Sequence, residues 1–446
     1  MGAEMGVMSA LANAGVESGV YSAHLAEVNE TRQVIATEDI YDARGILLIA
    51  KGGRITPKVT RAIAEFKLTK PIQDSIAIGQ EVKAGDLLKS FRAILEREST
   101  LATIHLRCDL QDLLEHQCHY YDQFPLLRQK ITVMAERMPE TYERSLYSAW
   151  FSLLMAKEMR LSPKDIGLVF LSALSHDIGM LHIDPAVLNK KERLSAEEWR
   201  QIQAHVVIGQ KILAAIKEVP VEVCTAVLEH HERCDGTGYP FGKVESELSL
   251  WGQIIALTDS IIAIYFNRFK PEGREWRDLI PVLQMNNQAF LYRNYEVLVT
   301  ILRRSDLPSS LSIKNEAVGL FVDRLVEKNR RLKDWLAEVN QALQSLGYTH
   351  GDRKLHGLQN IMIHIATAAT GSGIFDEGLV AWLVQLKQHP QAESQRELED
   401  IFLMQEEVGF HLQRLSRMAQ TYLTNNQHTP QPVEQALNQC IEAATA

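Results

Sequence analysis

The sequence has few of the features of an exported or membrane-anchored protein. Its 446 residues include only five cysteines, none in a CxxC pair, so we expect reduced thiols in the cytosol rather than a disulfide framework. The N-terminus lacks the basic start and long apolar core of a signal peptide. The longest apolar runs, LYSAWFSLLMA and IGLVFLSAL, are far shorter than the about 20 residues that a membrane span requires. The sequence therefore predicts a cytoplasmic protein with no membrane segment.

An excess of positive charge is also missing. The formal net charge of -9 argues against broad electrostatic binding to a nucleic acid polymer or an anionic membrane. A small anionic ligand is still compatible with this charge, because it requires only local positive charge or a metal. We find no internal repeat and no low-complexity tract.

The pattern along the chain predicts a mainly α fold with one small α+β module. The run VIATEDIYDARGILLIAKGGRIT contains short β-rich segments divided by glycines, and PKVTRAIAEF is typical of a short helix. From about residue 86 onward the pattern is helical. We expect five segments: a mobile leader at 1–28, the small α+β module at 29–85, connecting helices at 86–120, a core at 121–270 and a C-terminal helical domain at 271–446.

Three helices carry clear signals. Ser195 and Glu198 form a capping box that opens a helix continuing through Trp199 toward Ile216. Apolar residues from Val318 to Leu343 predict one long amphipathic helix that stops near Gly347, and those from Ile401 to Tyr422 predict a second. Two long amphipathic helices suit a structural bundle, or a surface for a homodimer or a signalling partner.

Histidines and carboxylates gather between residues 176 and 259. The candidates for metal ligands are His176, Asp177, His205, His230, His231 and Asp259, with Glu140 upstream. Imidazole and carboxylate together suit iron, manganese or zinc. Adjacent groups of this kind can bridge two ions that lower the pKa of a water and clamp a phosphoryl group. Any one of them alone would be read as an ordinary core or surface residue, whereas the joint pattern indicates a metal site.

The most specific motif is the pair His230–His231 followed directly by ERCDGTGYP. Together with LSALSHDIG upstream and LSLWGQIIALTDS downstream, it resembles the HD-GYP family of HD phosphohydrolases. The resemblance covers about a third of the chain. It implies an all-helical bundle with metals at its centre, and hydrolysis of cyclic di-GMP with two or three iron-like ions, iron or manganese being favoured. The module before the core also resembles a domain that some family members carry.

The resemblance implies a role for each matching residue. Asp177 would be the carboxylate that bridges the ions and, with Arg268, a catalytic group. The other metal ligands would be Glu140, His176, His205, His230, His231 and Asp259. The loop that shapes the substrate pocket would comprise Asp235, Gly236, Gly238, Tyr239 and Pro240. Arg268 would pair with a phosphate of the cyclic dinucleotide, a task that suits the planar fork of a guanidinium.

Two residues depart from the family pattern. Arg144 stands one helical turn after Glu140, where the family has a histidine ligand, and an arginine cannot ligate a metal. Met180 follows HDIG where the family has a lysine that contacts phosphate. One ion would lose a ligand and the pocket would lose a cation, which Arg144 could partly replace by reaching the phosphate itself.

Three alternatives stay open from the sequence. A catalytically degenerate HD-GYP domain would act as a nucleotide sensor or signalling scaffold, which Arg144 and Met180 favour. An HD phosphohydrolase for another phosphoester is the second, against which the GYP loop argues. A separate zinc site is the third; its candidates are His105, Cys108, His116, Cys118 and His119, although their spacing fits no zinc knuckle.

Overall fold

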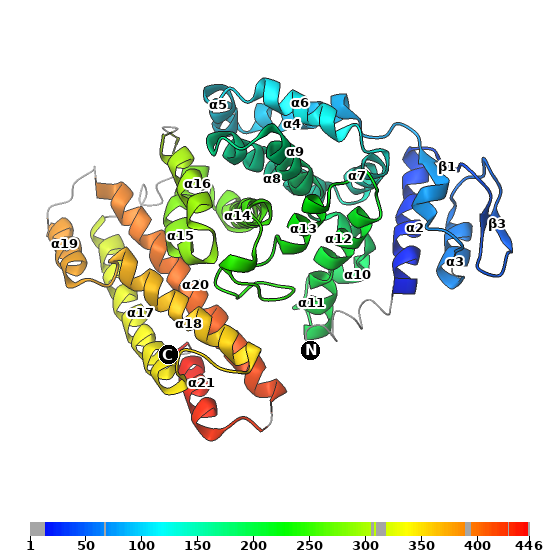
Figure 1. The fold of residues 1–446 in the computed structure, drawn as a ribbon. Coiled ribbons are helices and arrows are strands. Elements are labelled where there is room, and N and C mark those ends of the chain that lie inside the picture. The colour runs from blue at the N-terminus through cyan, green and yellow to red at the C-terminus, as the bar shows by residue number, and fades with distance from the viewer. Residues whose placement is uncertain are drawn as a thin grey trace. The chain divides into compact units, whose positions relative to one another are not determined.

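The computed structural model describes residues 14–66, 68–304, 307–308, 318–388, 394–426 and 428–444. These residues are mainly helical with a few short strands, so the predicted fold class is confirmed (Figure 1). The chain divides into two compact units. The first comprises the residues up to Glu232 with Tyr239–Phe241 and Leu248–Ile262, and the second comprises Arg233–Gly238, Gly242–Glu247 and Ala263–Ala446.

The small N-terminal module contains two antiparallel strand pairs. Strand β1 (Val34–Ala36) pairs with β4 (Ile76–Ile78), and β2 (Ile40–Tyr41) pairs with β3 (Leu47–Ile49). Helix α3 (Pro57–Glu65) begins with proline at its first position, where the missing N–H has no helical partner in any case. It corresponds to the helix that the sequence predicted from PKVTRAIAEF.

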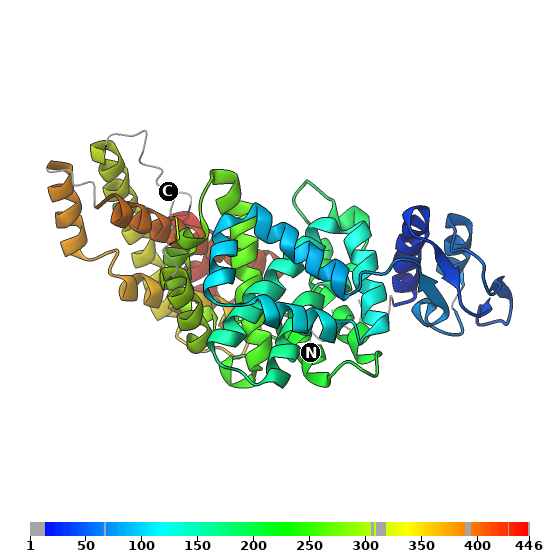
Figure 2. The same ribbon diagram turned by 90° about the horizontal axis from the view of Figure 1, so that it is seen from above.

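Helix α2 (Ala14–Thr31) corrects the expected leader. Residues 1–13 lie outside the described residues, but residues 14–28 are helical rather than a mobile tail. Tyr21, Leu25 and Val28 lie one turn or less apart and are fully buried. Figure 2 shows α2 beside α3, against which it packs, and α2 also contacts α7 (Pro125–Arg137) and the turn η2 (Ile178–His182). Its small, weakly patterned residues hid this helix, because tertiary burial rather than amphipathicity stabilises it.

The remaining helices of the first unit surround the ligand candidates. In chain order they are α4 (Ala84–Arg97), α5 (Ser99–Arg107), α6 (Gln111–Tyr121), α7, α8 (Pro139–Glu158), α9 (Pro163–Ser175), α10 (Pro185–Leu188), α11 (Ala196–Gln203), α12 (His205–Ala214), α13 (Val221–Glu229) and α14 (Leu250–Ile264). Helices α8 and α9 lie side by side (Figure 1), and α13 packs against both α9 and α12.

Helix α9 is the central element that leads to the HD motif. The hydroxyl of Ser162 accepts a hydrogen bond from the backbone N–H of Asp165, and Pro163 occupies the first helical position. Every residue from Ile166 to Ser175 is buried, which explains the unbroken apolar run. A helix that is apolar on all sides belongs in a core, and its C-terminal end therefore delivers His176 into the interior.

The capping box predicted from Ser195 and Glu198 is present. The Ser195 hydroxyl accepts from the Glu198 N–H, and the Glu198 carboxylate accepts from the Ser195 N–H. The single helix expected from this start breaks at Ala204 into α11 and α12. This break places His205 at the first position of a new helix, where it is fully buried.

Helix α14 carries Asp259 in its interior. The helical stretch Leu250–Glu272 is the one segment of the described residues that is long and apolar enough to suit a membrane span. More than half of its most apolar window, 56%, is buried within the protein, and a buried core helix has the same composition. Helix α14 begins at Leu250.

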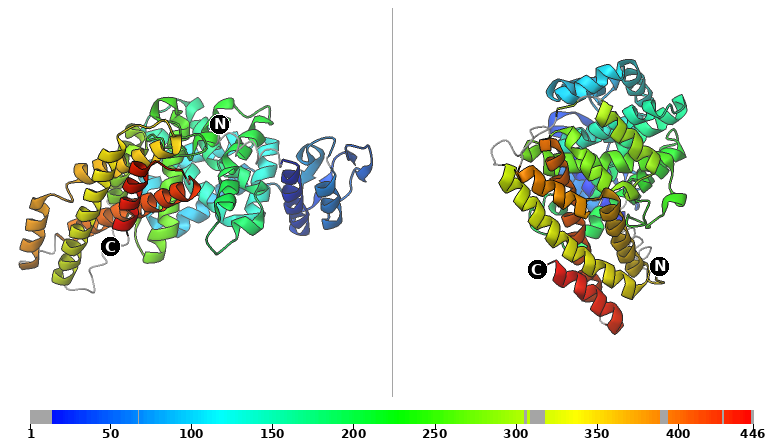
Figure 3. Two further views of the ribbon diagram at one scale, coloured as in Figure 1. Left: turned by 90° about the horizontal axis from the view of Figure 1, so that it is seen from below. Right: turned by 90° about the vertical axis from the view of Figure 1, so that its left-hand side faces the viewer.

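The second unit is a helical bundle. Its helices are α15 (Leu279–Met285), α16 (Tyr292–Arg304), α17 (Val318–Leu346), α18 (Arg353–Ser372), α19 (Glu377–Gln388), α20 (Gln395–Asn425) and α21 (Gln431–Ala443). Both long helices predicted from the sequence are present as α17 and α20. Helices α17, α20 and α21 pack together (Figure 3). They share an apolar core that includes Val339, Leu412 and Leu437.

Candidate metal centre

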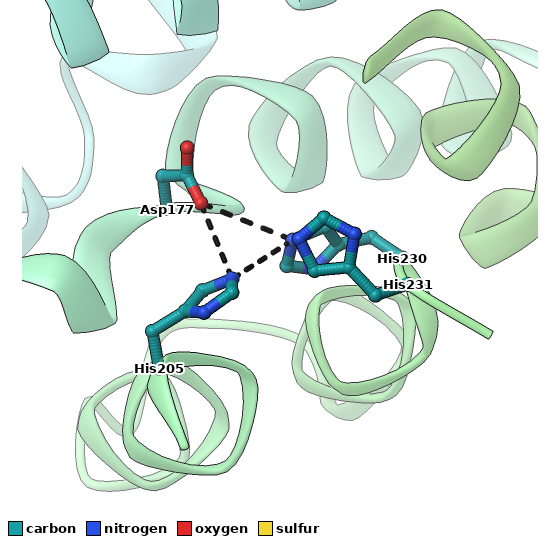
Figure 4. Close-up of side chains that lie close together, drawn as sticks. All are labelled: Asp177, His205, His230 and His231. Atoms are coloured by element: carbon teal, nitrogen blue, oxygen red, sulfur yellow. Dashed lines mark hydrogen bonds and ion pairs between the residues drawn. The ribbon is translucent and has the colours of Figure 1, made fainter. Parts of the chain in front are cut away.

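Four side chains from three parts of the first unit point toward one another (Figure 4). Asp177 follows α9 in the turn that begins η2, and His205 begins α12. His230 and His231 follow the C-terminal end of α13. One ligand atom of each of these four residues lies within 4.8 Å of the others. The structure therefore brings together residues that are separated by more than fifty positions in the chain.

The Asp177 carboxylate lies among three histidines. Its Oδ1 is 3.3 Å from Nε2 of His205 and 3.9 Å from Nε2 of His230. Its Oδ2 is 3.3 Å from Nε2 of His176. Each oxygen thus faces a different set of imidazoles, which is the geometry required of a bridging carboxylate.

Asp259 closes the other side of the cluster. Its Oδ1 lies 3.6 Å from Nε2 of His176, and its Oδ2 lies 3.7 Å from Nδ1 of His231. All six residues of the expected cluster between 176 and 259 therefore meet in one place. The side chains of Asp177 and Asp259 are only 15% and 18% exposed, so water screens their charges weakly.

Backbone carbonyls fix the orientation of three of the imidazoles. The Nδ1–H groups of His176, His205 and His230 donate to the carbonyls of Ala173, Ile202 and Val227, at 2.8, 2.6 and 2.6 Å. In each case the acceptor is three residues earlier in the chain. The same bond fixes the tautomer, so the lone pair is on Nε2 and points into the cluster.

The surroundings favour neutral imidazoles at His205 and His230, a charged imidazole at His176 and ionised carboxylates beside them. Burial lowers the pKa of His230 to about 3, with the nearby His176 and His205 acting in the same direction, and burial also lowers the pKa of His205. Burial opposes ionisation of Asp177, yet the surrounding histidines hold its pKa below the usual range. For His176, burial is outweighed by Asp177 and Asp259, which raise its pKa well above the ordinary value.

These residues fit a divalent metal ion. Nε2 of His205 and Nε2 of His230 lie 3.3 Å apart, and a cation between them would bind both lone pairs. Two nitrogens bound to one ion at about 2.1 Å stand roughly 3–4 Å apart, as observed here. In addition, the buried Nε2 of His176 makes no hydrogen bond although it faces two carboxylates. A metal cation bound at Nε2 of His176 would neutralise the negative charge of Asp177 and Asp259, as a proton on Nε2 would.

Gly179, the glycine of the HDIG motif, allows η2 to approach α12. A Cβ atom at Gly179 would lie 2.0 Å from the carbonyl oxygen of His205 and 2.8 Å from the backbone nitrogen of Gly209. Such distances are impossible for any side chain, so only glycine lets the two backbones meet. This contact sets how far Asp177 lies from His205.

The loop at 235–240 is divided between the two units. In the first unit, Tyr239 stacks on His231 with ring centroids 4.6 Å apart, and its N–H donates to the His231 carbonyl. Pro240 follows Tyr239 through a cis peptide bond. In the second unit, Asp235 accepts two hydrogen bonds from Thr237, and Gly236 adopts a positive φ of 75°, which glycine tolerates.

Helix α18 holds the Asp235 end of this loop within the second unit. Asn360 donates to the Asp235 backbone carbonyl at 2.8 Å. Nδ1 of His364 lies 3.4 Å from Oδ2 of Asp235, and Nε2 of His364 donates to the Met285 carbonyl at 3.1 Å. The nearby His364 keeps the pKa of Asp235 low despite burial. The loop is thus a built element and not a surface connector.

Three sequence candidates take other positions. Glu140 is exposed in the first turn of α8, and it is not one of the four residues whose ligand atoms lie within 4.8 Å of one another. Arg144 lies one turn later on the same helix and is half-buried. Met180 packs against an apolar cluster of Ile183, Ala204 and Ile208.

Arg268 lies in a π-helical turn, η4 (Tyr265–Phe269), that belongs to the second unit. Its terminal nitrogen NH1 donates to Oε2 of Glu407 in α20 at 2.7 Å. The Arg268 side chain is 31% exposed, whereas the Glu407 side chain is only 3% exposed. The arginine that the resemblance assigns to a phosphate is therefore bonded to a buried carboxylate.

The alternative zinc site has no support in the described residues. Both nitrogens of His105 have other partners, since Nε2 lies 3.2 Å from Gln111 and Nδ1 accepts from Trp150. Within the part of the chain that the structure describes, the one group that could hold a metal is the Asp177 cluster.

Sequence reasoning missed the partners that support these residues. Glu407, His411 and His364 lie far from the motif in the chain. Glu407 and His411 belong to α20, which the sequence predicted as part of a bundle or of a partner surface. One signal was available: Glu407 lies on the same face of α20 as Leu403 and His411, four residues away in each direction. A charged residue at a buried position of an amphipathic helix indicates a partner.

Comparison with known proteins supports the sequence resemblance. Residues 128–290 match the family described as the HD domain. A cyclic di-GMP phosphodiesterase of Pseudomonas aeruginosa is 32% identical over 136 residues, 30% of this chain and 32% of that protein. A 3'3'-cGAMP-specific phosphodiesterase of Vibrio cholerae is 34% identical over 137 residues, 30% of this chain and 29% of that protein.

A third relative has the same extent of similarity. A cyclic di-GMP phosphodiesterase of Thermotoga maritima is 34% identical over 130 residues, 29% of this chain and 35% of that protein. The chain thus spans about a third of the length of the curated relatives that it matches. The resemblance inferred from the HDIG and GYP motifs is confirmed, because residues 128–290 match the HD domain and the chain is similar over about 130 residues to proteins named cyclic di-GMP phosphodiesterases.

Proposed function

We propose that this chain is a metal-dependent phosphodiesterase that hydrolyses cyclic di-GMP. One observation carries the proposal: six ligand-type residues converge, and a cation between the facing Nε2 atoms of His205 and His230 would bind both lone pairs. In this proposal Asp177 and Arg268 are the catalytic groups. The product is a linear dinucleotide or GMP.

The proposed cofactor is two or more divalent transition-metal ions, iron or manganese. The proposed ligands are Glu140, His176, Asp177, His205, His230, His231 and Asp259. When bound, such ions lower the pKa of a water and neutralise charge that develops on the phosphoryl oxygens. Exposed Glu140 would have to turn inward to join the others, so it is the ligand least supported by the geometry.

The protein's own residues would orient the reaction. The carbonyls of Ala173, Ile202 and Val227 hold the imidazoles in one tautomer and one direction. Arg268 would hold a phosphate of the substrate by charge-assisted hydrogen bonds, and Arg144 could supply a second cation. The loop residues Asp235, Gly236, Gly238, Tyr239 and Pro240 would shape the pocket, with Tyr239 stacked on His231 as a fixed wall.

Substrate choice among cyclic dinucleotides is part of the proposal. Relatives of this chain include phosphodiesterases named for cyclic di-GMP and for 3'3'-cGAMP. The decisive experiment is anaerobic purification, metal analysis, and parallel hydrolysis assays on both dinucleotides. Metal-dependent cleavage of cyclic di-GMP supports the proposal, and a metal-loaded protein that cleaves neither dinucleotide refutes it.

A second candidate function is a catalytically degenerate domain that acts as a nucleotide sensor or signalling scaffold. Arg144 in place of a histidine ligand favours it, as does Met180, which packs against an apolar cluster and offers no cation. A sensor would bind cyclic di-GMP without turnover, whereas a scaffold would bind neither nucleotide nor a full metal complement. The same assays, combined with calorimetry, separate these outcomes.

From the composition we propose a cytoplasmic protein that contacts neither a membrane nor a nucleic acid polymer. Its proposed domains are the module at 29–85, the connecting helices at 86–120, the core at 121–270 and the C-terminal helical domain at 271–446. The mobile leader is not proposed, because residues 14–28 belong to helix α2. The long helices α17 and α20 would offer a surface for a homodimer or a signalling partner. Sedimentation of the full chain with and without cyclic di-GMP tests the dimer.

A further inference from the structure

Glu407 is a buried carboxylate whose contacts lead to Arg268. It is 2% exposed and belongs to α20, far from the motif residues in the chain. Its Oε2 accepts from NH1 of Arg268 at 2.7 Å, and its Oε1 accepts from Asn286 at 2.8 Å. Nε2 of His411 lies 3.4 Å from the same Oε1. A carboxylate with this many partners is fixed in place, and so is the guanidinium bonded to it.

Arg268 is held at one side only. Among the described residues, NH1 makes its one hydrogen bond to Glu407, while the guanidinium carbon lies 5.5 Å from the ring centre of Phe410. Arg268 also lines a cavity of about 1420 Å³ within the second unit. Because a guanidinium has five N–H donors, the donors that Glu407 does not use can still form a bidentate bond to phosphate.

The contacts of Glu407 continue through His411 and His364 to the loop at 235–240. The rings of His411 and His364 lie 5.2 Å apart, and His364 faces Asp235. Helices α18 and α20 therefore support both Arg268 and Asp235, two of the residues that the proposed function assigns to the substrate. This support lies wholly within the second unit.

We propose that Glu407 is a positioning residue that orders Arg268 for the phosphate of the cyclic dinucleotide. The inference rests on the proposed function. Arg268 has a long side chain, and ordering such a chain at the moment of binding costs affinity. A guanidinium already anchored by Glu407 avoids this cost, which corresponds to about ten-fold in the dissociation constant.

The test is a double-mutant cycle with cyclic di-GMP as the probe, measured by calorimetry on the full metal-loaded chain. Arg268→Ala should weaken binding by about ten-fold or more. Glu407→Ala should weaken it by about five- to ten-fold, and Glu407→Gln, which keeps an acceptor oxygen, by less. The double variant Arg268→Ala/Glu407→Ala should bind no more weakly than Arg268→Ala alone, because Glu407 acts through Arg268.

Glu399 supplies a matched control. It is 1% exposed on the same helix and pairs with Arg274 at 3.4 Å, so Glu399→Ala also breaks a buried Glu–Arg pair. This variant should lose stability while its affinity for cyclic di-GMP and its metal content stay unchanged. If Glu399→Ala weakens binding as much as Glu407→Ala does, the effect is structural and the inference is overturned.

Other outcomes also overturn the inference. Tighter binding by Glu407→Ala would show that the carboxylate competes with phosphate, and a loss that persists undiminished in the Arg268→Ala background would show that Glu407 acts elsewhere. Both results leave the proposed function intact, because the unmodified protein binds. Failure of the unmodified, metal-loaded protein to bind or cleave any cyclic dinucleotide is a different result, and it refutes the proposed function together with this inference.

Discussion

The Nε2 atoms of His205 and His230 face each other across 3.3 Å, and the second nitrogen of each ring donates to a backbone carbonyl. Both facing atoms therefore carry lone pairs. Burial lowers the pKa of each ring, so protonation does not relieve this repulsion at neutral pH. The fold holds the two rings in an arrangement that a cation stabilises, with Oδ1 of Asp177 as the third donor.

Replacement of Asp177 by alanine should abolish metal binding and any hydrolysis. The Asp177 carboxylate is the group that contacts His176 through one oxygen and His205 through the other. Metal content per chain after anaerobic purification measures the effect. A ligand that binds only the folded state stabilises that state. Added metal should therefore raise the melting temperature of the natural protein but not that of the Asp177→Ala variant. Asp184→Ala removes an exposed N-cap carboxylate nearby and should cost about 1 kcal/mol without changing metal content.

Replacement of Gly179 by alanine should separate η2 from α12. The new Cβ would lie 2.0 Å from the His205 carbonyl oxygen, so the backbones must move apart by at least an ångström. Overpacking of this kind costs about 1–3 kcal/mol, and the displaced Asp177 should bind metal less tightly. Urea unfolding and metal analysis measure both effects.

Gly357→Ala is the control for that substitution. Gly357 lies in helix α18 with open space around its Cβ direction, so alanine there should be neutral or stabilising by up to about 1 kcal/mol. A Gly179→Ala protein with normal stability and metal content would show that the contact between η2 and α12 does not set the cluster geometry.

Replacement of Arg144 by histidine should increase the metal bound per chain. Arg144 stands one turn after Glu140 on α8, so a histidine there would share a face with it. A guanidinium offers no lone pair to a metal, whereas a histidine at this position offers one. Hydrolysis should rise with metal content when both proteins are prepared under the same metal supply. A histidine variant that gains metal without activity would favour the sensor function and point to Met180.

The stability of the protein should depend on His411 in mildly acidic solution. Burial lowers the pKa of His411 to about 4, against about 6.5 in an unfolded chain. As the pH falls through this range the unfolded chain takes up the proton first, so stability is full above about pH 6.5 and declines toward pH 4. The total loss is about 3 kcal/mol.

Urea unfolding of the natural protein and of His411→Gln between pH 7 and pH 4 measures this contribution. The glutamine variant cannot take up the proton, so its stability should fall less steeply over the same interval. Parallel curves for the two proteins would mean that His411 is accessible to protons in the folded state.

The sequence alone predicted the fold class and the identity of the ligand cluster. The capping box at Ser195 and the two long helices of the second unit followed from local patterns, which depend on helix geometry and need no knowledge of neighbours. The six residues of the cluster followed from a motif. Imidazole and carboxylate at these motif positions indicate a metal site, whatever number of residues separates them in the chain.

Local patterns failed where long-range packing decides. Helix α2 has no amphipathic signal and forms because Tyr21, Leu25 and Val28 are buried against other elements. The break at Ala204 between α11 and α12 is equally invisible to periodicity, since apolar spacing continues across it.

Only the tertiary structure decided which residues support the site. The pairing of Arg268 with Glu407 joins positions 139 residues apart, and the approach of η2 to α12 depends on the backbone of His205 meeting Gly179. A sequence determines which donors and acceptors are present. Their distances depend on how helices pack, and a buried carboxylate or glycine acquires its role only when packing supplies its partner.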